Sequence, residues 1–220
     1  MTRLMRIVRE SHTKIGYREV RGVLGENFVS PEDIGRAKGI NYGRKLLKQL
    51  AETLPPEDVL QWLRENEYVL VAGSPLPMSS SGVQQTFGLP VRLVRIGKLT
   101  FSQENEIASA LRGIQDRISA GWLMFRKVPC LDSVHKVLED QRSLLSQVEY
   151  VPNLAEAMWC IAACKAVHNI KLFPHILVRT ASTLNGNSLH IGEVTDDGAV
   201  VGSSWRTFKS IVLGIASARK

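Results

Sequence analysis

Three side chains of the kind that carry out nucleophilic chemistry lie close together in the chain: Cys130, Ser133 and His135. Ser133 begins a Ser-x-x-Lys pattern, which penicillin-recognising enzymes use with the serine as nucleophile, but their Ser-Asp-Asn and Lys-Thr-Gly elements do not occur here. A Cys130 thiolate beside a His135 imidazole is a second route to a nucleophile. A small hydrolase or transferase using this region, with Arg126 or Arg179 orienting an anionic substrate, is therefore an alternative function. The simpler interpretation is that Ser133 caps the following helix, and we assign no catalytic residue.

A second group contains side chains that are common metal ligands. Glu156, Cys160, Cys164 and His168 recur every four residues, which places them along one stripe of a helix. Four residues rise by about 6 Å along a helix, so at most two neighbours can share one ion. Cysteines in an apolar helix are usually small core residues. We therefore predict core packing for Cys160, Cys164 and His168, with no metal and no cofactor.

Basic residues form the third group. The chain carries 28 Lys and Arg against 21 Asp and Glu, a net charge of +7, and residues 1–50 alone hold 11 basic and 5 acidic residues. A polyanion would meet this part of the chain first. The sequence therefore predicts phosphate contacts by the basic side chains Arg3, Arg6, Arg9, Arg36, Lys38, Arg44, Lys45 and Lys48, with Tyr42 among them.

Glycines in the same region suggest an assembly role. Gly35, Gly39 and Gly43 are four residues apart, and on one helix they would form a smooth groove where another backbone can approach closely. The groove favours a helix–helix contact, within the chain or between copies of it. A partner protein or self-association through these glycines is therefore a further alternative, with the loop at residues 73–90 as a second contact.

These residues must be positioned by helices and strands that the local sequence predicts. Ser30-Pro31-Glu32-Asp33 begins a helix that runs to about Thr53, and the Asn153 to Glu156 spacing begins another that ends near Ile170. Asn185-Gly186 and Asp196-Asp197-Gly198 are typical of tight hairpin turns. Further helices are expected from Glu57, at 102–118, at 133–147 and from about Arg206, and strands at 68–72, 91–96, 122–128, 175–181, 188–194 and 199–204.

Together these elements predict an α+β fold. We expect a mixed or antiparallel sheet of about six strands, covered by helices and ending in a C-terminal β-meander. A basic helical N-terminal segment, residues 1–55, would precede an α+β domain at residues 56–220. No stretch is long and apolar enough for a membrane span, and the three cysteines are too few for a disulfide scaffold, which favours a cytoplasmic protein without a membrane partner.

Several short motifs in the second of these domains resemble a group of uncharacterised bacterial proteins. They are residues 68–79, Gly121-Trp122, 126–129, 149–152, Val178-Arg179, 197–205 and Leu213-Gly214. The resemblance covers the chain from about residue 60 to its end and implies one ordered domain, without an activity, a cofactor or a catalytic residue. The leading functional hypothesis is thus a non-enzymatic binding protein that associates with nucleic acid through its basic N-terminal segment.

Overall fold

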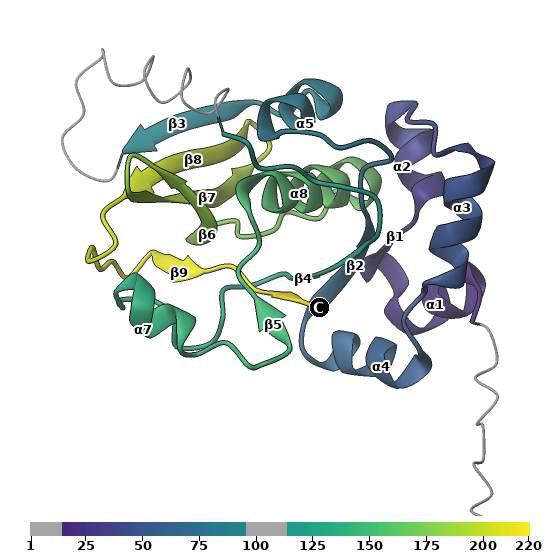
Figure 1. Cartoon of the computed structure of the whole chain (residues 1–220), viewed down its shortest axis with the longest axis horizontal. Coiled ribbons are helices and arrows are strands. Elements are labelled where there is room, and N and C mark those ends of the chain that lie inside the picture. Colours follow the sequence, from purple (N-terminus) through teal and green to yellow (C-terminus); the bar gives the residue numbers. More distant parts are fainter. Residues whose placement is uncertain (1–14, 96–113) are drawn as a thin grey trace, which may run out of the picture.

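A computed structural model describes residues 15–95 and 114–220 of the chain. In this part the protein is α+β, as the sequence predicts, with seven α-helices and two mixed sheets of five strands each (Figure 1). The expectation of one sheet of about six strands is wrong, because short strands far apart in the sequence pair into a separate sheet. In the first sheet the strands lie in the order β1-β2-β4-β10-β5, and in the second sheet they lie in the order β3-β8-β7-β6-β9.

The bounds of the elements are as follows. The first sheet contains β1 (Phe28–Val29), β2 (Tyr68–Ala72), β4 (Trp122–Arg126), β5 (Glu149–Tyr150) and β10 (Ala218–Arg219). The second sheet contains β3 (Val91–Arg95), β6 (Leu177–Leu184), β7 (Asn187–Thr195), β8 (Gly198–Ser204) and β9 (Leu213–Ile215). The helices are α1 (Tyr17–Leu24), α2 (Pro31–Lys38), α3 (Gly43–Glu52), α4 (Glu57–Glu65), α5 (Ser80–Phe87), α7 (Leu138–Arg142) and α8 (Leu154–His168).

Helix α8 is the centre of the main core. It begins with the predicted capping box, in which the Asn153 side chain accepts from the Glu156 amide and the Glu156 carboxylate accepts from the Asn153 amide. Its first three turns are buried on nearly every side, because both sheets contribute apolar residues to the cluster around it. The buried indole of Trp159 donates to the Ala72 carbonyl of β2 at 2.7 Å, which ties the helix to the first sheet.

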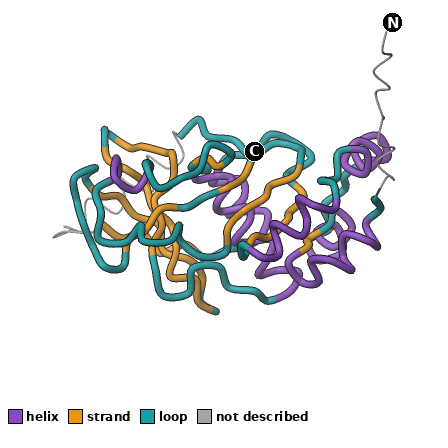
Figure 2. Tube along the Cα trace, turned by 90° about the horizontal axis from the view of Figure 1, so that it is seen from below, coloured by secondary structure: helices purple, strands orange, loops and turns teal. Residues whose placement is uncertain are grey.

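The opposite face of the first sheet is covered by α1 and α4. Tyr68 and Leu70 of β2 point to that face and pack with Val20 and Leu24 of α1. The alternate residues of the strand, such as Val69, face α8. β1 pairs in parallel with β2, so a strand from the N-terminal 55 residues belongs to the same sheet as the rest. Figure 2 shows the helices of this region gathered at one end of the molecule, away from the second sheet.

The second sheet contains the predicted meander β6-β7-β8. Its first turn has positive φ at both Asn185 (49°) and Gly186 (79°), as the sequence indicates. The second turn leads into Gly198, whose φ is 126°. Alternate residues on these strands face α8, and the others form what we call the outer face of the second sheet.

Several local predictions are wrong. The helix expected from Ser30 to Thr53 is two helices, because Gly39 takes a left-handed conformation (φ 70°) and ends α2. The loop expected at 73–90 contains α5, which Ser79 caps by accepting from the Gly82 amide. The helix expected at 133–147 shrinks to α7, and the terminal helix expected from Arg206 is replaced by β9 and β10. Residues 102–113 of the helix expected at 102–118 lie outside the described residues, and its described end, residues 114–118, is not helical.

No helix in the described part of the chain is long and apolar enough to cross a membrane. This observation agrees with the sequence, in which charged residues interrupt the most apolar stretch, now seen as α8. The predicted residues Arg3, Arg6 and Arg9 lie outside the described residues.

Candidate functional site

The helix pair α2–α3 holds five of the eight basic residues that the sequence singles out. Ser30 caps α2 as predicted, with its hydroxyl accepting from the Asp33 amide at 3.2 Å and the Asp33 carboxylate accepting from the Ser30 amide at 3.1 Å. The turn Gly39–Tyr42 follows, and Asn41 braces it by accepting from the Gly43 amide at 2.8 Å. The pair is therefore a helix, a short glycine-containing turn and a second helix.

Apolar contacts attach the helix pair α2–α3 to the rest of the fold. Ile34 of α2 and Leu50 of α3 are buried in the main core, and Leu46 and Leu47 pack against it. The Leu50 carbonyl also accepts from the Trp122 indole at 2.9 Å. The buried side of α3 thus holds leucines, and its other side is left to solvent.

The basic side chains differ in how far they are engaged. Lys38 donates to the Phe87 carbonyl at the end of α5 at 2.7 Å, so it has a structural contact that the sequence does not indicate. Arg36 lies 3.9 Å from Asp33, and Lys48 lies 4.0 Å from Glu52, both as loose surface pairs. For Arg44 and Lys45 no ion pair is found within the described ranges.

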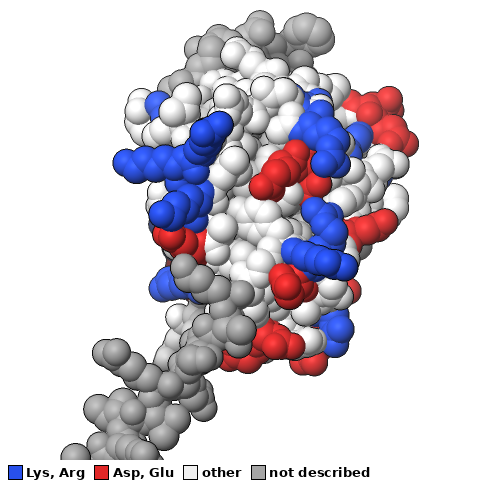
Figure 3. All heavy atoms as spheres, turned by 90° about the vertical axis from the view of Figure 1, so that its right-hand side faces the viewer, with Lys and Arg blue, Asp and Glu red and all other residues white. Residues whose placement is uncertain are grey.

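The start of α3 concentrates positive charge. Arg44 and Lys45 lie in its first turn, which has no acidic residue, and the N-cap residue Tyr42 makes no side-chain capping hydrogen bond. Their charges add to the positive end of the helix dipole, where an acidic residue would be stabilising and a basic one is not. Figure 3 views this end of the molecule and shows Lys and Arg in separate groups with carboxylates between them. The positive surface at this end of the molecule is thus interrupted and does not form a continuous belt (Figure 3).

A hollow of about 300 Å³ lies beside the turn of the pair, lined in part by Gly35, Gly39, Tyr42 and Glu32. The three glycines do not share one helix, so the predicted continuous groove is wrong. A Cβ on Gly35 would lie 2.9 Å from the Ile40 carbonyl oxygen, so this glycine allows a close approach within the chain. Tyr42 is buried instead of facing phosphates, and burial and then Glu32 raise the pKa of its hydroxyl.

The three candidates for nucleophilic chemistry do not converge. Ser133 is buried, and its hydroxyl accepts from the Ile215 amide of β9 at 3.2 Å, so it does not cap a helix as expected. The Cys130 thiol packs with Leu138 and Ile215, and burial raises its pKa. His135 is exposed on the surface, with φ 58°. Among the described residues no hydrogen bond joins these three side chains, so the structure lends no support to the hydrolase or transferase hypothesis.

On α8 the two cysteines are core residues as predicted, whereas His168 is only half-buried because it lies in the last turn, beyond the buried part of the helix. Cys160 and Cys164 are completely buried, and burial raises the pKa of both thiols, that of Cys164 to about 12. His168 lies 3.2 Å from the Phe28 carbonyl through its Nε2 atom. Within the described ranges no group of three or more His, Cys, Asp or Glu side chains is arranged to hold a metal ion.

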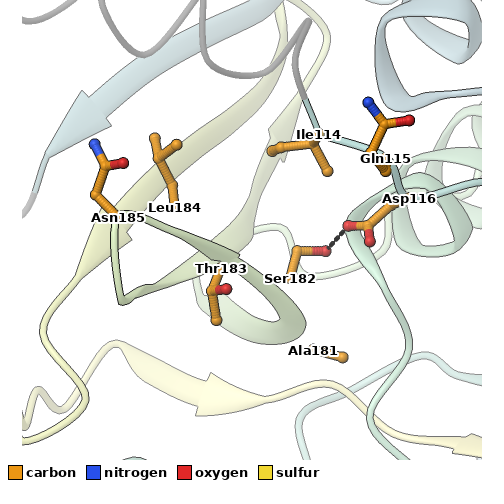
Figure 4. Close-up of a pocket in the computed structure, with 8 residues that line it drawn as sticks. All are labelled: Ile114, Gln115, Asp116, Ala181, Ser182, Thr183, Leu184 and Asn185. Atoms are coloured by element: carbon orange, nitrogen blue, oxygen red, sulfur yellow. Dashed lines mark hydrogen bonds between the residues drawn. The ribbon is translucent and has the colours of Figure 1, made fainter.

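A second hollow, of about 510 Å³, lies between residues 114–116 and 181–185. In Figure 4 the Asp116 carboxylate and the Ser182 hydroxyl point toward each other from opposite sides, and they are hydrogen bonded. Ser182 also accepts from the Leu154 amide at the start of α8 at 2.7 Å. Both hydrogen-bonding roles of Ser182 are therefore occupied, and the carboxylate makes the hollow unsuited to a polyanion.

Comparison with known proteins supplies no template for these sites. No family model matches the chain, and neither the curated proteins nor the solved structures contain a match. The outer face of the second sheet also carries buried polar residues that the sequence does not single out, chiefly His190 and Ser204. The available signal was a histidine between the apolar residues Leu189 and Ile191 of a predicted strand.

Proposed function

We propose that α2 and α3 form a helix–turn–helix unit that binds duplex nucleic acid, with α3 facing the ligand. The observation that carries the proposal is the exposed side of α3, on which Arg44, Lys45 and Lys48 are the charged residues of its first two turns. In helix–turn–helix proteins the second helix contacts the nucleic acid and the first crosses the backbone.

The electrostatics of α3 support a phosphate ligand. Arg44 and Lys45 lie at the positive end of the helix dipole, where positive side chains are unfavourable. A phosphate bound there would be attracted by both side chains and by the dipole. Lys48 lies one turn further along the same helix and would extend the contact to a neighbouring phosphate. Contacts of this kind are independent of base sequence and weaken as salt rises.

The contacts that attach α2 and α3 to the core support a rigid interface. Ile34 and Leu50 anchor the two helices in the core that surrounds α8, and Lys38 ties the end of α2 to α5. A helix held in this way loses little freedom on binding, which reduces the entropic cost of the complex. Arg3, Arg6 and Arg9 would add further phosphate contacts if the N-terminal residues reach the same duplex.

The experiment compares two variants of equal charge. Arg44→Ala, Lys45→Ala and Lys48→Ala are combined in one chain, and the exposed residues Arg64, Lys209 and Lys220 are changed to alanine in the control. Binding of a fluorescent duplex is measured by anisotropy at two salt concentrations. We expect the α3 variant to bind about 10- to 100-fold more weakly at low salt and the control to bind nearly as the original chain does. Equal weakening of the two variants would show that the net charge, and not α3, determines binding.

A further inference from the structure

The outer face of the second sheet carries a cluster of buried polar side chains. Arg179 of β6 lies directly opposite His190 of β7, and His190 lies opposite Gly202 of β8. Ser204 is two residues beyond Gly202 and so lies on the same face. All three side chains are buried, with Arg179 and His190 fully inaccessible to solvent. We refer to Arg179, His190 and Ser204 as the outer-face cluster.

Arg179 is a buried cation whose partners in the described part of the chain are all neutral. Its Nη1 atom donates to the Gln141 side-chain oxygen at 2.7 Å and to the Lys136 carbonyl at 3.2 Å. Its Nη2 atom donates to the Phe208 carbonyl at 2.5 Å and lies 3.5 Å from that of Trp205. Burial lowers the pKa of the guanidinium to about 10. Buried charges in proteins are normally paired with an opposite charge, and residues 15–95 and 114–220 supply none to Arg179.

Four polar atoms of the cluster have no hydrogen-bond partner within the described ranges. They are Arg179 Nε, both ring nitrogens of His190 and the Ser204 hydroxyl. Buried polar atoms are satisfied in nearly all native proteins, and several unsatisfied ones on one face require an explanation. Gln141 shows the contrast, because its amide group donates to the Ser133 and Leu213 carbonyls and accepts from Arg179.

The unsatisfied atoms share one chemical property. Arg179 Nε and the Ser204 hydroxyl can donate, and His190 can donate from one ring nitrogen in its neutral form or from both when protonated. Burial and then the charge of Arg179 lower the pKa of His190 to about 3, so the imidazole is neutral near pH 7. Gly202 lies opposite His190 and, as a glycine, places no side chain there that could accept a hydrogen bond from the ring.

We propose that the outer-face cluster binds a small oxyanion, the carboxylate or phosphate group of a ligand, which accepts hydrogen bonds from Arg179, His190 and Ser204. The anion supplies the negative charge that Arg179 lacks and the acceptors that the three side chains lack. The site is separate from α2–α3, and its function does not depend on nucleic-acid binding.

The experiment uses the full chain with inorganic phosphate and with acetate as probes. Binding is measured by calorimetry, and the ring nitrogens of His190 are followed by ¹⁵N NMR. We expect at least one probe to bind and to shift the His190 resonances. A stronger effect of phosphate or of acetate distinguishes the two sources of the oxyanion.

Two variants in the same strand locate the site. Ser204→Ala removes one donor and is expected to weaken binding of that probe about 10- to 100-fold. Ser203→Ala changes the neighbouring serine, which faces the other side of the sheet, and is expected to leave binding unchanged. Unchanged His190 resonances with both probes would overturn the proposal, because they would indicate that only internal water satisfies the cluster. Equal effects of the two serine variants would overturn it as well.

Discussion

Replacing His190 by leucine should make the ligand-free protein more stable. The side chain is fully buried, and neither ring nitrogen has a partner in the described part of the chain. Each unsatisfied buried polar atom costs about 1–3 kcal/mol, and leucine of similar size removes both atoms while adding apolar burial. Allowing for imperfect packing of the new side chain, we expect His190→Leu to raise the free energy of unfolding by about 1–3 kcal/mol.

The assay is urea unfolding followed by the fluorescence of the four tryptophans, with the melting temperature as a second measure. For a chain of this size the melting temperature should rise by about 2–4 °C per kcal/mol. Gln141→Leu is the control, because Gln141 is also buried but fully hydrogen bonded, and this change should destabilise the protein by about 3 kcal/mol or more. If His190→Leu destabilised the protein as Gln141→Leu does, the ring nitrogens would have partners in solution and the reasoning would fail.

Three other predictions concern the fold. Burial opposes ionisation of Glu149, but hydrogen bonds outweigh it and lower its pKa to about 2, so its contribution to stability is present above pH 4.5 and lost as the pH falls toward 2. Glu149→Gln should lower the free energy of unfolding by about 1 kcal/mol at pH 7 and make that free energy less dependent on pH between 4.5 and 2. An unchanged acid unfolding curve would contradict this. Gly198→Ala places a Cβ 2.1 Å from a backbone oxygen and should destabilise the protein by about 3 kcal/mol or more, against about 1 kcal/mol for Gly88→Ala, which has open space, as judged by urea midpoints. Cys160 and Cys164 should not react with a thiol reagent at pH 8 until the protein unfolds, and rapid labelling of either in the native state would show that α8 is less buried than described.

The features that the sequence predicts correctly are set by neighbouring residues. Ser30 and Asn153 cap their helices through side chains that reach only three residues along the chain. Asn185-Gly186 specifies its turn because both residues tolerate positive φ. Basic residues at the start of α3 are identified by type alone, since charged side chains rarely leave the surface.

The features that the sequence does not predict depend on distant partners. β9 forms by pairing with β6, and β10 by pairing with β4 and β5, so the local helical pattern after Arg206 is overridden. Gly39 is compatible with a helix interior and with a helix end, and only the packing of α2 and α3 selects the end. The burial of His190 follows from the register of three strands, which is not visible in the local sequence.

The claim that α3 faces nucleic acid is tested most directly by lysine footprinting. The full chain is acetylated briefly with and without duplex DNA, and modification of each lysine is quantified by mass spectrometry. Lys45 and Lys48 are exposed on α3, whereas Lys209 and Lys220 are exposed elsewhere and serve as internal controls. The proposal predicts that DNA protects Lys45 and Lys48 and leaves the two controls unchanged. Protection of Lys209 and Lys220, with Lys45 and Lys48 still reactive, would contradict it.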